Sequence, residues 1–408
     1  MSETTHPEKK SGTNRSYIIW LALIGILILI GLISAVLVFW KGLTLTNMSD
    51  TVPWGLWITI DLSAIALGAG AFTLSAIVYV FGVESFRPIL RLAVWLGFIG
   101  YTSALLTLLL DIGRPDRFYH PWIYWNVHSV LWEITWCITI YLSILILEFL
   151  PTIADARIFN RWPWFKRGAA VLHKATPALA LIGLGISLLH QSSLGAAYGI
   201  VRSRAIWFKP SMPIMFIVSA VAVGPAFTVA IAYILEWVTG KRSIPQNVLV
   251  TILKFSGFGL LVYGYIKMWD YLAIAYYGNT QAVTESLSLL NQATPYNFTF
   301  WIFEVVLGIV IPAVIFLSSR FNRNPALVVL GASLAVVGII VNRWNVTVSG
   351  LFIPLEYSPG TLYRPEPVSY FPNSIEWGIA IGILGYMLLM LTLGARYLPL
   401  FNKEQSHS

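Results

Sequence analysis

Ten long apolar runs constrain this chain more than any other feature. An α-helix needs roughly 20 residues to cross about 30 Å of hydrocarbon. The runs lie at about 17–41, 54–82, 88–111, 128–150, 168–191, 212–238, 247–272, 296–318, 325–347 and 374–397. The bilayer core offers no hydrogen-bond partner to an open backbone. We therefore predict an all-α, polytopic integral membrane bundle.

Composition excludes several other classes of protein. The 408 residues are 57% hydrophobic and 11% charged, unlike a soluble domain. The net charge of +8 does not indicate nucleic-acid binding, because Lys and Arg lie in short loops between the apolar runs. Cys137 is the single cysteine, so this chain contains no intramolecular disulfide and no cysteine-ligated iron–sulfur cluster.

The distribution of Lys and Arg predicts the orientation. With both termini on one side, that side receives Lys9, Lys10, Arg15, Arg87, Arg91, Arg157, Arg161, Lys166, Arg167, Lys241, Arg242, Arg320, Arg323, Arg396 and Lys403. The other side receives Lys41, Arg114, Arg117, Arg202, Arg204, Lys209 and Arg364. Basic residues favour the cytoplasmic side of a membrane. We predict cytoplasmic tails at 1–16 and 398–408 around a transmembrane domain at 17–397.

Polar residues within the spans collect near the opposite, non-cytoplasmic end. They are Asp61, Asp111, His128, Glu133, His190, Asp270, Glu304, Asn342, Arg343, Asn345 and Glu376. Unpaired polar groups in hydrocarbon are costly, so such residues face the bundle interior, a partner or a wet cavity. We predict one polar pocket open toward that side. The loops there are rich in Trp and Tyr, which indicates either partner docking or an aromatic belt at the membrane interface.

Histidine placement argues against haem. A transmembrane b-type haem normally needs two axial ligands that face one another from spans. Only His128, His173 and His190 lie in or near spans, and His173 is near the cytoplasmic end. The usual two-haem arrangement cannot be built from them. We expect no haem, and the sequence shows no metal-ligand spacing.

Two acids and one histidine are the strongest candidates for proton chemistry. Asp61 lies among small residues that permit close helix packing, and Glu133 follows Asn126, His128 and Ser129 at the start of a span. His190 lies where a span meets the outer face. Placed beside Glu133, it would form a hydrogen-bonding and proton-relay site. The alternative is that the acids only hold helices together and the histidine bonds to a loop.

Other charged residues are interpreted structurally. Lys267 and Asp270 are three residues apart on one helix, so we predict that they pair. Asp111 and Arg114 are predicted to cap a helix and order a loop. Arg343 is either a helix-end anchor or part of the pocket.

This pattern fits a quinone, which carries two electrons and two protons. A quinone needs apolar and aromatic walls for its ring and tail, polar groups for its oxygens and a nearby acid or base. Trp57 and Trp132 are candidate walls, and Asn126, His128 and Ser129 are candidate polar contacts. A transporter would also have a polar, enclosed substrate site, and a structural anchor without a quinone site is a third possibility.

The motifs resemble those of the NrfD/polysulfide-reductase membrane-subunit family. The nearest branches are the membrane subunits of group-1 respiratory nickel–iron hydrogenases and of periplasmic menaquinone reductase complexes. The matching stretches are Pro53 to Ile58 running into Asp61, Asp111 to Arg114, Asn126 to Glu133, Leu145 to Phe149, and His190 to Gly195. The second half of the chain matches mainly in its pattern of spans.

The resemblance implies a haem-free subunit of the bacterial inner membrane that binds menaquinone near the periplasmic face. Electrons would come from a periplasmic four-cluster-type iron–sulfur subunit, fed by a hydrogenase, a molybdopterin-type subunit or a multihaem cytochrome c. Glu133 and His190 match family positions implicated in quinone and proton handling. We add Asp61 to these two as a candidate. The position of His128 is often asparagine in the hydrogenase branch. Quinol oxidation by the same site is the family alternative.

The resemblance also implies proton movement between the cytoplasm and the quinone. Hydroxyls along the second and fourth spans could supply a route: Thr59, Ser63, Thr73, Ser75, Tyr79, Thr135, Thr139, Tyr141 and Ser143. Hydroxyls on helices are more often satisfied by their own backbone.

Overall fold

The computed structural model describes residues 13–155, 162–204, 206–240, 244–278, 281–292, 294–352, 355–358, 361–363 and 370–401. Within these ranges, ten helical segments are long and apolar enough to cross a membrane. They are α1 (Thr13–Lys41), α2 (Leu56–Tyr79), α3 (Arg87–Asp111), α5 (Val130–Ala154), α6 (Pro163–Gly199), α7 (Met212–Thr239), α8 (Gln246–Tyr277), a composite of α10 (Tyr296–Phe298), the π-helix η5 (Thr299–Val310) and α11 (Ile311–Leu317), α12 (Pro325–Thr347) and α13 (Ser374–Tyr397). The predicted all-helical membrane fold is confirmed.

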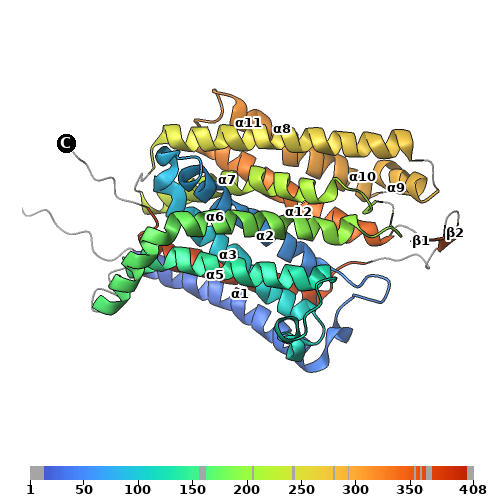
Figure 1. Ribbon diagram of the computed structural model, residues 1–408, viewed down its shortest axis with the longest axis horizontal. Helices are drawn as coiled ribbons and strands as arrows, with labels where there is room; N and C mark the ends of the chain where they lie inside the picture. The colour runs from blue at the N-terminus through green and yellow to red at the C-terminus, as the bar shows by residue number, and fades with distance from the viewer. Residues whose placement is uncertain are drawn as a thin grey trace, which may run out of the picture.

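Short elements occupy the loops. They are α4 (His120–Ile123), α9 (Gln281–Gln292) and the 3₁₀ turns η1 (Leu43–Leu45), η2 (Glu84–Phe86), η3 (Pro115–Arg117) and η6 (Ser349–Phe352). Strands β1 (Leu355–Ser358) and β2 (Thr361–Tyr363) form an antiparallel hairpin that the sequence analysis did not predict. Figure 1 shows α9 and the hairpin at one end of the bundle, here called the loop-rich end. The cytoplasmic side predicted above corresponds to the other end.

Polar side chains fix the starts of several helices. Ser129 precedes α5 and its hydroxyl accepts a hydrogen bond from the Trp132 amide at 3.3 Å. Asn373 and Glu376 form a capping box at the start of α13. The Glu376 carboxylate also accepts from the Tyr370 hydroxyl at 2.5 Å and from the Asn47 amide at 3.0 Å. Glu376 therefore holds α13 to the loop after α1.

The helices pack as two groups joined through α2 and α7. α2, α3, α5 and α6 contact one another, as do α7, α8, η5–α11 and α12, whereas α1 packs mainly on α13. Figure 1 shows α8 and α11 on one side of the bundle and α1 on the other. α2 is the most buried of the ten segments.

Small residues bring α2 against its neighbours. A Cβ atom on Gly100 of α3 would lie 2.6 Å from the Ala64 carbonyl oxygen of α2. A Cβ atom on Gly70 would lie 2.7 Å from the Gly224 carbonyl oxygen of α7. Real side chains do not tolerate these distances, so the glycines permit backbone contact between spans. The close packing expected around Asp61 and Gly70 is confirmed.

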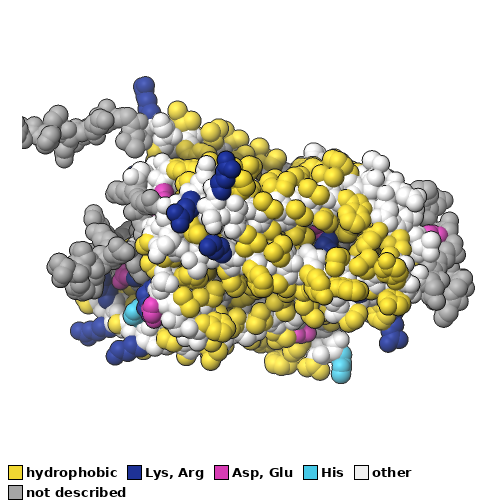
Figure 2. Space-filling view, turned by 90° about the horizontal axis from the view of Figure 1, so that it is seen from above, with side chains coloured by type: hydrophobic (Ala, Val, Ile, Leu, Met, Phe, Trp, Pro, Cys, Tyr) yellow, Lys and Arg dark blue, Asp and Glu magenta, His cyan; other side chains and the backbone are white. Residues whose placement is uncertain are grey.

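The surface is that of a membrane protein. Figure 2 shows a broad hydrophobic face, with Lys and Arg gathered mainly toward the end opposite the loop-rich end. Of the basic residues used to predict orientation, Lys9, Lys10, Arg157, Arg161, Lys241, Arg242, Arg364 and Lys403 lie outside the described residues, as do most of both predicted tails. The orientation itself remains a prediction.

Replacing Gly100 tests the α2–α3 contact. Gly100→Leu must push α3 away from the Ala64 carbonyl, and overpacking of this kind costs about 1–3 kcal/mol of stability. We expect a lower melting temperature in detergent, measured by loss of the monodisperse chromatographic peak. Gly25→Leu is the matched control, because a Cβ atom at Gly25 of α1 meets nothing within 4 Å. Equal melting of both variants would contradict the packing argument.

Candidate functional site

A cavity of about 590 Å³ lies among α2, α3, α5 and α6 at the loop-rich end. This volume is within the roughly 300–1,000 Å³ typical of small-molecule sites. Its apolar lining consists of Ile58, Leu62, Ile65, Leu108, Ile112, Pro121, Leu131, Ile134, Ile138, Leu194 and Ala197. Its polar and aromatic lining consists of Trp54, Asp61, Asp111, His120, Tyr124, Asn126, Ser129, Trp132, Thr135, His190 and Tyr198. We call this space the α2–α6 cavity.

Asp61 and His190 bring ionisable groups to this cavity from two helices. Asp61 is 5% exposed and His190 is 0% exposed. Neither imidazole nitrogen of His190 forms a hydrogen bond with another described residue. Asp61 Oδ1 likewise has no hydrogen-bond partner among the described residues. Buried polar groups are normally hydrogen-bonded, so these atoms are suited to a ligand or water in the cavity.

His190 lies deeper than predicted. The expectation that it sits where a span meets the outer face is wrong, because α6 continues to Gly199. The imidazole packs edge-on against the Tyr101 ring, with centroids 5.6 Å apart. A buried histidine inside a helix therefore replaces the predicted interfacial one.

Three other predicted contacts also line the cavity. Asn126 and Ser129 lie in the turn before α5, where the Asn126 side chain accepts from the His128 amide at 3.3 Å. Trp132 follows on the first turn of α5, and its indole donates to the Pro121 carbonyl at 3.0 Å. That bond fixes the ring between α5 and the α4 loop. The start of α5 thus supplies both polar and aromatic lining.

Three predicted site residues lie outside the lining. Trp57 is buried against α13, and its indole donates to the Glu376 carbonyl at 3.2 Å. His128 is exposed in the loop before α5. Glu133 faces α6, where the Ser193 hydroxyl donates to its Oε1 at 2.7 Å. A helix turns by about 100° per residue, so Glu133 points away from the face formed by Leu131, Ile134 and Ile138.

Glu133 and His190 do not form the direct pair that was proposed. Glu133 bonds to Ser193, one turn after His190 on α6. Ser193 also donates to the Leu189 carbonyl at 2.9 Å. Glu133 therefore bears on the cavity indirectly, because its bond to Ser193 holds α5 and α6 together.

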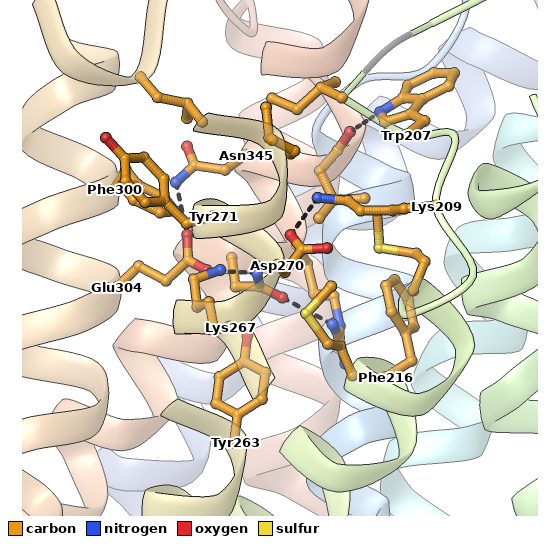
Figure 3. A pocket seen from close by; sticks show the side chains of 18 residues that line it. Trp207, Lys209, Phe216, Tyr263, Lys267, Asp270, Tyr271, Phe300, Glu304 and Asn345 are labelled. Carbon is orange, nitrogen blue, oxygen red and sulfur yellow. Dashed lines mark hydrogen bonds and ion pairs between the residues drawn. The ribbon is translucent and has the colours of Figure 1, made fainter. Parts of the chain in front are cut away.

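The remaining polar residues form a second group in the other half of the bundle. Figure 3 shows Glu304, Lys267 and Asn345 turned toward one another, and Lys209 bonded to Asp270. The predicted Lys267–Asp270 pair is wrong: Lys267 pairs with Glu304 of η5, and Asp270 pairs with Lys209 at 2.6 Å. The prediction of a single polar pocket is also wrong. The two groups line separate cavities, and the Trp54 and Tyr198 rings of the α2–α6 cavity lie against Trp207 of the second cavity, with ring centroids 5.9 Å and 5.1 Å apart.

Several lining residues were given another role in the sequence analysis or were not singled out there. Asp111 was assigned to capping, yet it lines the cavity, and Arg114 pairs instead with Asp116 at 3.0 Å. Trp54 and Tyr198 form an aromatic wall with ring centroids 5.4 Å apart. The resemblance included the segments around Asp111 and Trp54, which was a usable signal. Tyr198 lay beyond the expected end of its span.

No group of three or more His, Cys, Asp or Glu side chains in the described part of the chain is arranged to hold a metal ion. The expected absence of haem stays an expectation.

The fold and cavity define a class: a multi-pass membrane protein with an amphipathic, acid- and histidine-lined site at one end of a helix bundle. Residues 44–354 match the family model described as polysulphide reductase, NrfD. The chain belongs to this family.

Relatives cover nearly the whole chain. It is 35% identical to the menaquinone reductase integral membrane subunit of Nitratidesulfovibrio vulgaris, over 95% of this chain and 93% of that protein. It is 26% identical to the Hdr-like menaquinol oxidoreductase integral membrane subunit of Archaeoglobus fulgidus, over 87% of each. It is 27% identical to the probable Ni/Fe-hydrogenase 2 b-type cytochrome subunit of Escherichia coli, over 91% of this chain and 90% of that protein.

Proposed function

We propose that this chain is the quinone-binding membrane subunit of a respiratory oxidoreductase complex and that menaquinone is reduced in the α2–α6 cavity. The observation that carries the proposal is the juxtaposition of Asp61, Asp111 and His190 with aliphatic and aromatic walls in one cavity of about 590 Å³. The 35% identity to a menaquinone reductase subunit supports the choice of substrate.

The lining suits a quinone at both of its ends. A fused aromatic ring would lie against Trp132, Trp54 and Tyr198, which offer flat apolar surface. An isoprenoid tail would follow Leu131, Ile134 and Ile138 along α5, where Leu131 is 65% exposed. The two carbonyl oxygens would meet His190 and Asp61.

Asp61 and His190 would handle the protons. Reduction of a quinone to a quinol takes two electrons and two protons, one proton to each oxygen. Both side chains are buried, line the cavity and have atoms without protein hydrogen-bond partners among the described residues. A general acid must reach the atom it protonates, and these two side chains line the same cavity from α2 and α6.

Glu133 would act as a positioning residue. Its carboxylate holds the Ser193 hydroxyl, which lies on the same helix as His190. This bond fixes α6 against the start of α5. Its contribution to quinone reduction would therefore be smaller than that of a group inside the cavity.

Electrons would arrive from a partner at the loop-rich end, which we infer to be periplasmic. A single cysteine cannot hold an iron–sulfur cluster, so the chain needs a donor subunit. A periplasmic iron–sulfur protein fits, fed by hydrogenase, molybdopterin-type or multihaem cytochrome c subunits. The loop before α5 exposes Phe118, Ile123, Trp125 and Val127 beside the cavity, and exposed apolar patches of this kind contact either a partner protein or the membrane.

Quinol oxidation is the alternative within the same site, since the Archaeoglobus relative is described as a menaquinol oxidoreductase subunit. The cavity residues serve both directions, because proton transfer is reversible. The transporter interpretation is disfavoured by full-length similarity to oxidoreductase subunits.

Substitution of the two cavity groups tests the proposal. In the purified complex, Asp61→Asn and His190→Ala should each lower the turnover of a water-soluble menaquinone analogue by about 100-fold or more, as expected for loss of a proton donor. The partner's iron–sulfur centres should still be reduced by the electron donor, which is followed by EPR.

Glu133→Gln and Asp155→Asn sharpen this test. Glu133→Gln should cost less than about tenfold, because a glutamine can still accept from Ser193 and the group lies outside the cavity. Asp155→Asn changes an exposed acid at the far end and should have no effect. Full activity in both cavity variants at equal assembly would move the quinone site elsewhere.

Filling the cavity tests where the quinone binds. Ala197 lines the cavity on α6, and Ala197→Phe should raise the KM for the analogue at least several-fold by occupying the ring's space. Ala178→Phe on the exposed surface of the same helix is the matched control. An unchanged KM in Ala197→Phe would contradict the assignment.

Protons would reach this site through the interior of the same four helices. Tyr101 contacts His190, and its ring lies 4.5 Å from that of Tyr141. Two turns further along α5, about 10 Å away, Glu148 accepts from the Ser75 hydroxyl at 2.9 Å. Glu148 also lines a small cavity near the opposite end of the bundle. These residues mark a polar route with Glu148 as its entrance.

Glu148→Gln should slow analogue reduction several-fold with little change in KM, because the cavity stays intact while proton delivery is impaired. The measurement is steady-state kinetics in proteoliposomes at several pH values. Glu84→Gln is the matched control, since Glu84 is exposed near the same end. Equal rates for wild type and Glu148→Gln at all pH values would exclude this entrance.

A further inference from the structure

The second polar group surrounds a small cavity of about 60 Å³ between α7, α8, η5 and α12 (Figure 3). A water molecule needs only about 10–15 Å³ of such space. The cavity therefore has room for a few water molecules or for one small ion. It is separate from the α2–α6 cavity and has no part in the proposed quinone chemistry.

Five charged side chains line this cavity, and their charges do not balance. Lys209, Lys267 and Arg343 are cations, whereas Asp270 and Glu304 are anions. Both anions are already matched. Asp270 accepts from Lys209 and from the Ser211 hydroxyl, each at 2.6 Å. The surplus is one positive charge.

Glu304 uses both carboxylate oxygens. It pairs with Lys267, and it accepts from the Asn342 amide at 2.6 Å and from the Asn345 amide at 3.0 Å. A carboxylate with three such donors has little capacity left for a second cation. Glu304 reaches Arg343 only through the Asn342 side chain.

The surplus charge is on Arg343. This side chain is 1% exposed, and among the described residues no carboxylate lies within salt-bridge distance of it. Its hydrogen bonds go to neutral groups, the side-chain amide oxygen of Asn342 at 2.8 Å and the Ser219 hydroxyl at 3.0 Å. Its Nε–H has no protein acceptor in the described ranges.

Neutral partners offset only part of this charge. The guanidinium lies over the Phe216 ring at 3.7 Å, a cation–π contact. It also lies in the last turns of α12, where the helix dipole favours cations. A desolvated charge is nevertheless expected to have an opposite charge beside it.

We propose that this cavity binds one small monovalent inorganic anion of halide size, held by Arg343 and shielded by the Lys209–Asp270 pair. The space of about 60 Å³ is enough for an ion of this size. Asp270 and Glu304 do not attract a cation into the same space, because each is neutralised by a lysine. The anion would stabilise the contact of α12 with α7.

Chloride binding is the direct test. The intact protein in detergent is exchanged into gluconate and titrated with chloride, and the ³⁵Cl NMR line width is followed. Wild type should give a broadening component that bromide competes away. Arg343→Gln should lose that component. Arg202→Gln, an exposed arginine at the same end, should retain it.

A second measurement covers the case in which Arg343→Gln does not fold. Wild-type crystals grown in bromide should give one anomalous peak next to Arg343, within the cavity. A cavity without this peak, or line broadening that does not saturate in wild type, would overturn the proposal and leave water only. Neither measurement involves quinone, so the outcome is independent of the proposed function.

Discussion

Close contact between helix backbones at α2 is the feature on which the rest of this structure depends. Within lipid there is little hydrophobic gain from helix association, so spans adhere through packing of small residues and through buried hydrogen bonds. The contacts of Ala64 with Gly100 and of Gly70 with Gly224 hold α2 against α3 and α7. Asp61 lies one turn closer to the loop-rich end, where the α2–α6 cavity opens. The close contact of α2 with α3 and α7 fixes the position of Asp61, and the cavity at the loop-rich end leaves space beside its carboxylate.

The two halves of the bundle treat buried polar groups differently. In the half that contains Lys267 and Glu304, ion pairs and hydrogen bonds satisfy both buried carboxylates, and Arg343 Nε is an exception. In the half that contains Asp61 and His190, the same kind of residue has atoms without protein partners in the described ranges. Unsatisfied burial lowers stability, so such residues are expected where a ligand or water completes the bonding. This contrast, more than the presence of charges, distinguishes the candidate active site.

Span pattern was predictable from sequence, because every span must be apolar over a fixed length whatever it packs against. The residues of the site were only partly predictable. One cavity brings together five of the residues that the sequence analysis assigned to the quinone site: Asp61, Asn126, Ser129, Trp132 and His190. Trp57 and Glu133 do not, since the face of a helix that meets a neighbour depends on rotation and crossing geometry.

Ion-pair partners were the least predictable feature, and the reason is physical. Spacing along one helix suggested Lys267 with Asp270, a local contact worth a few tenths of a kcal/mol when exposed. Inside a bundle, partners on other helices compete for the same groups with better geometry and less water. Glu304, from an irregular π-helical segment that apolar patterning cannot reveal, takes Lys267, and Asp270 takes Lys209 instead. Among the described residues, that exchange leaves Arg343 without a carboxylate within salt-bridge distance, and the acids of the α2–α6 cavity form no ion pair there. The separation of charge between the two halves is thus a property of the assembled bundle and of no single helix.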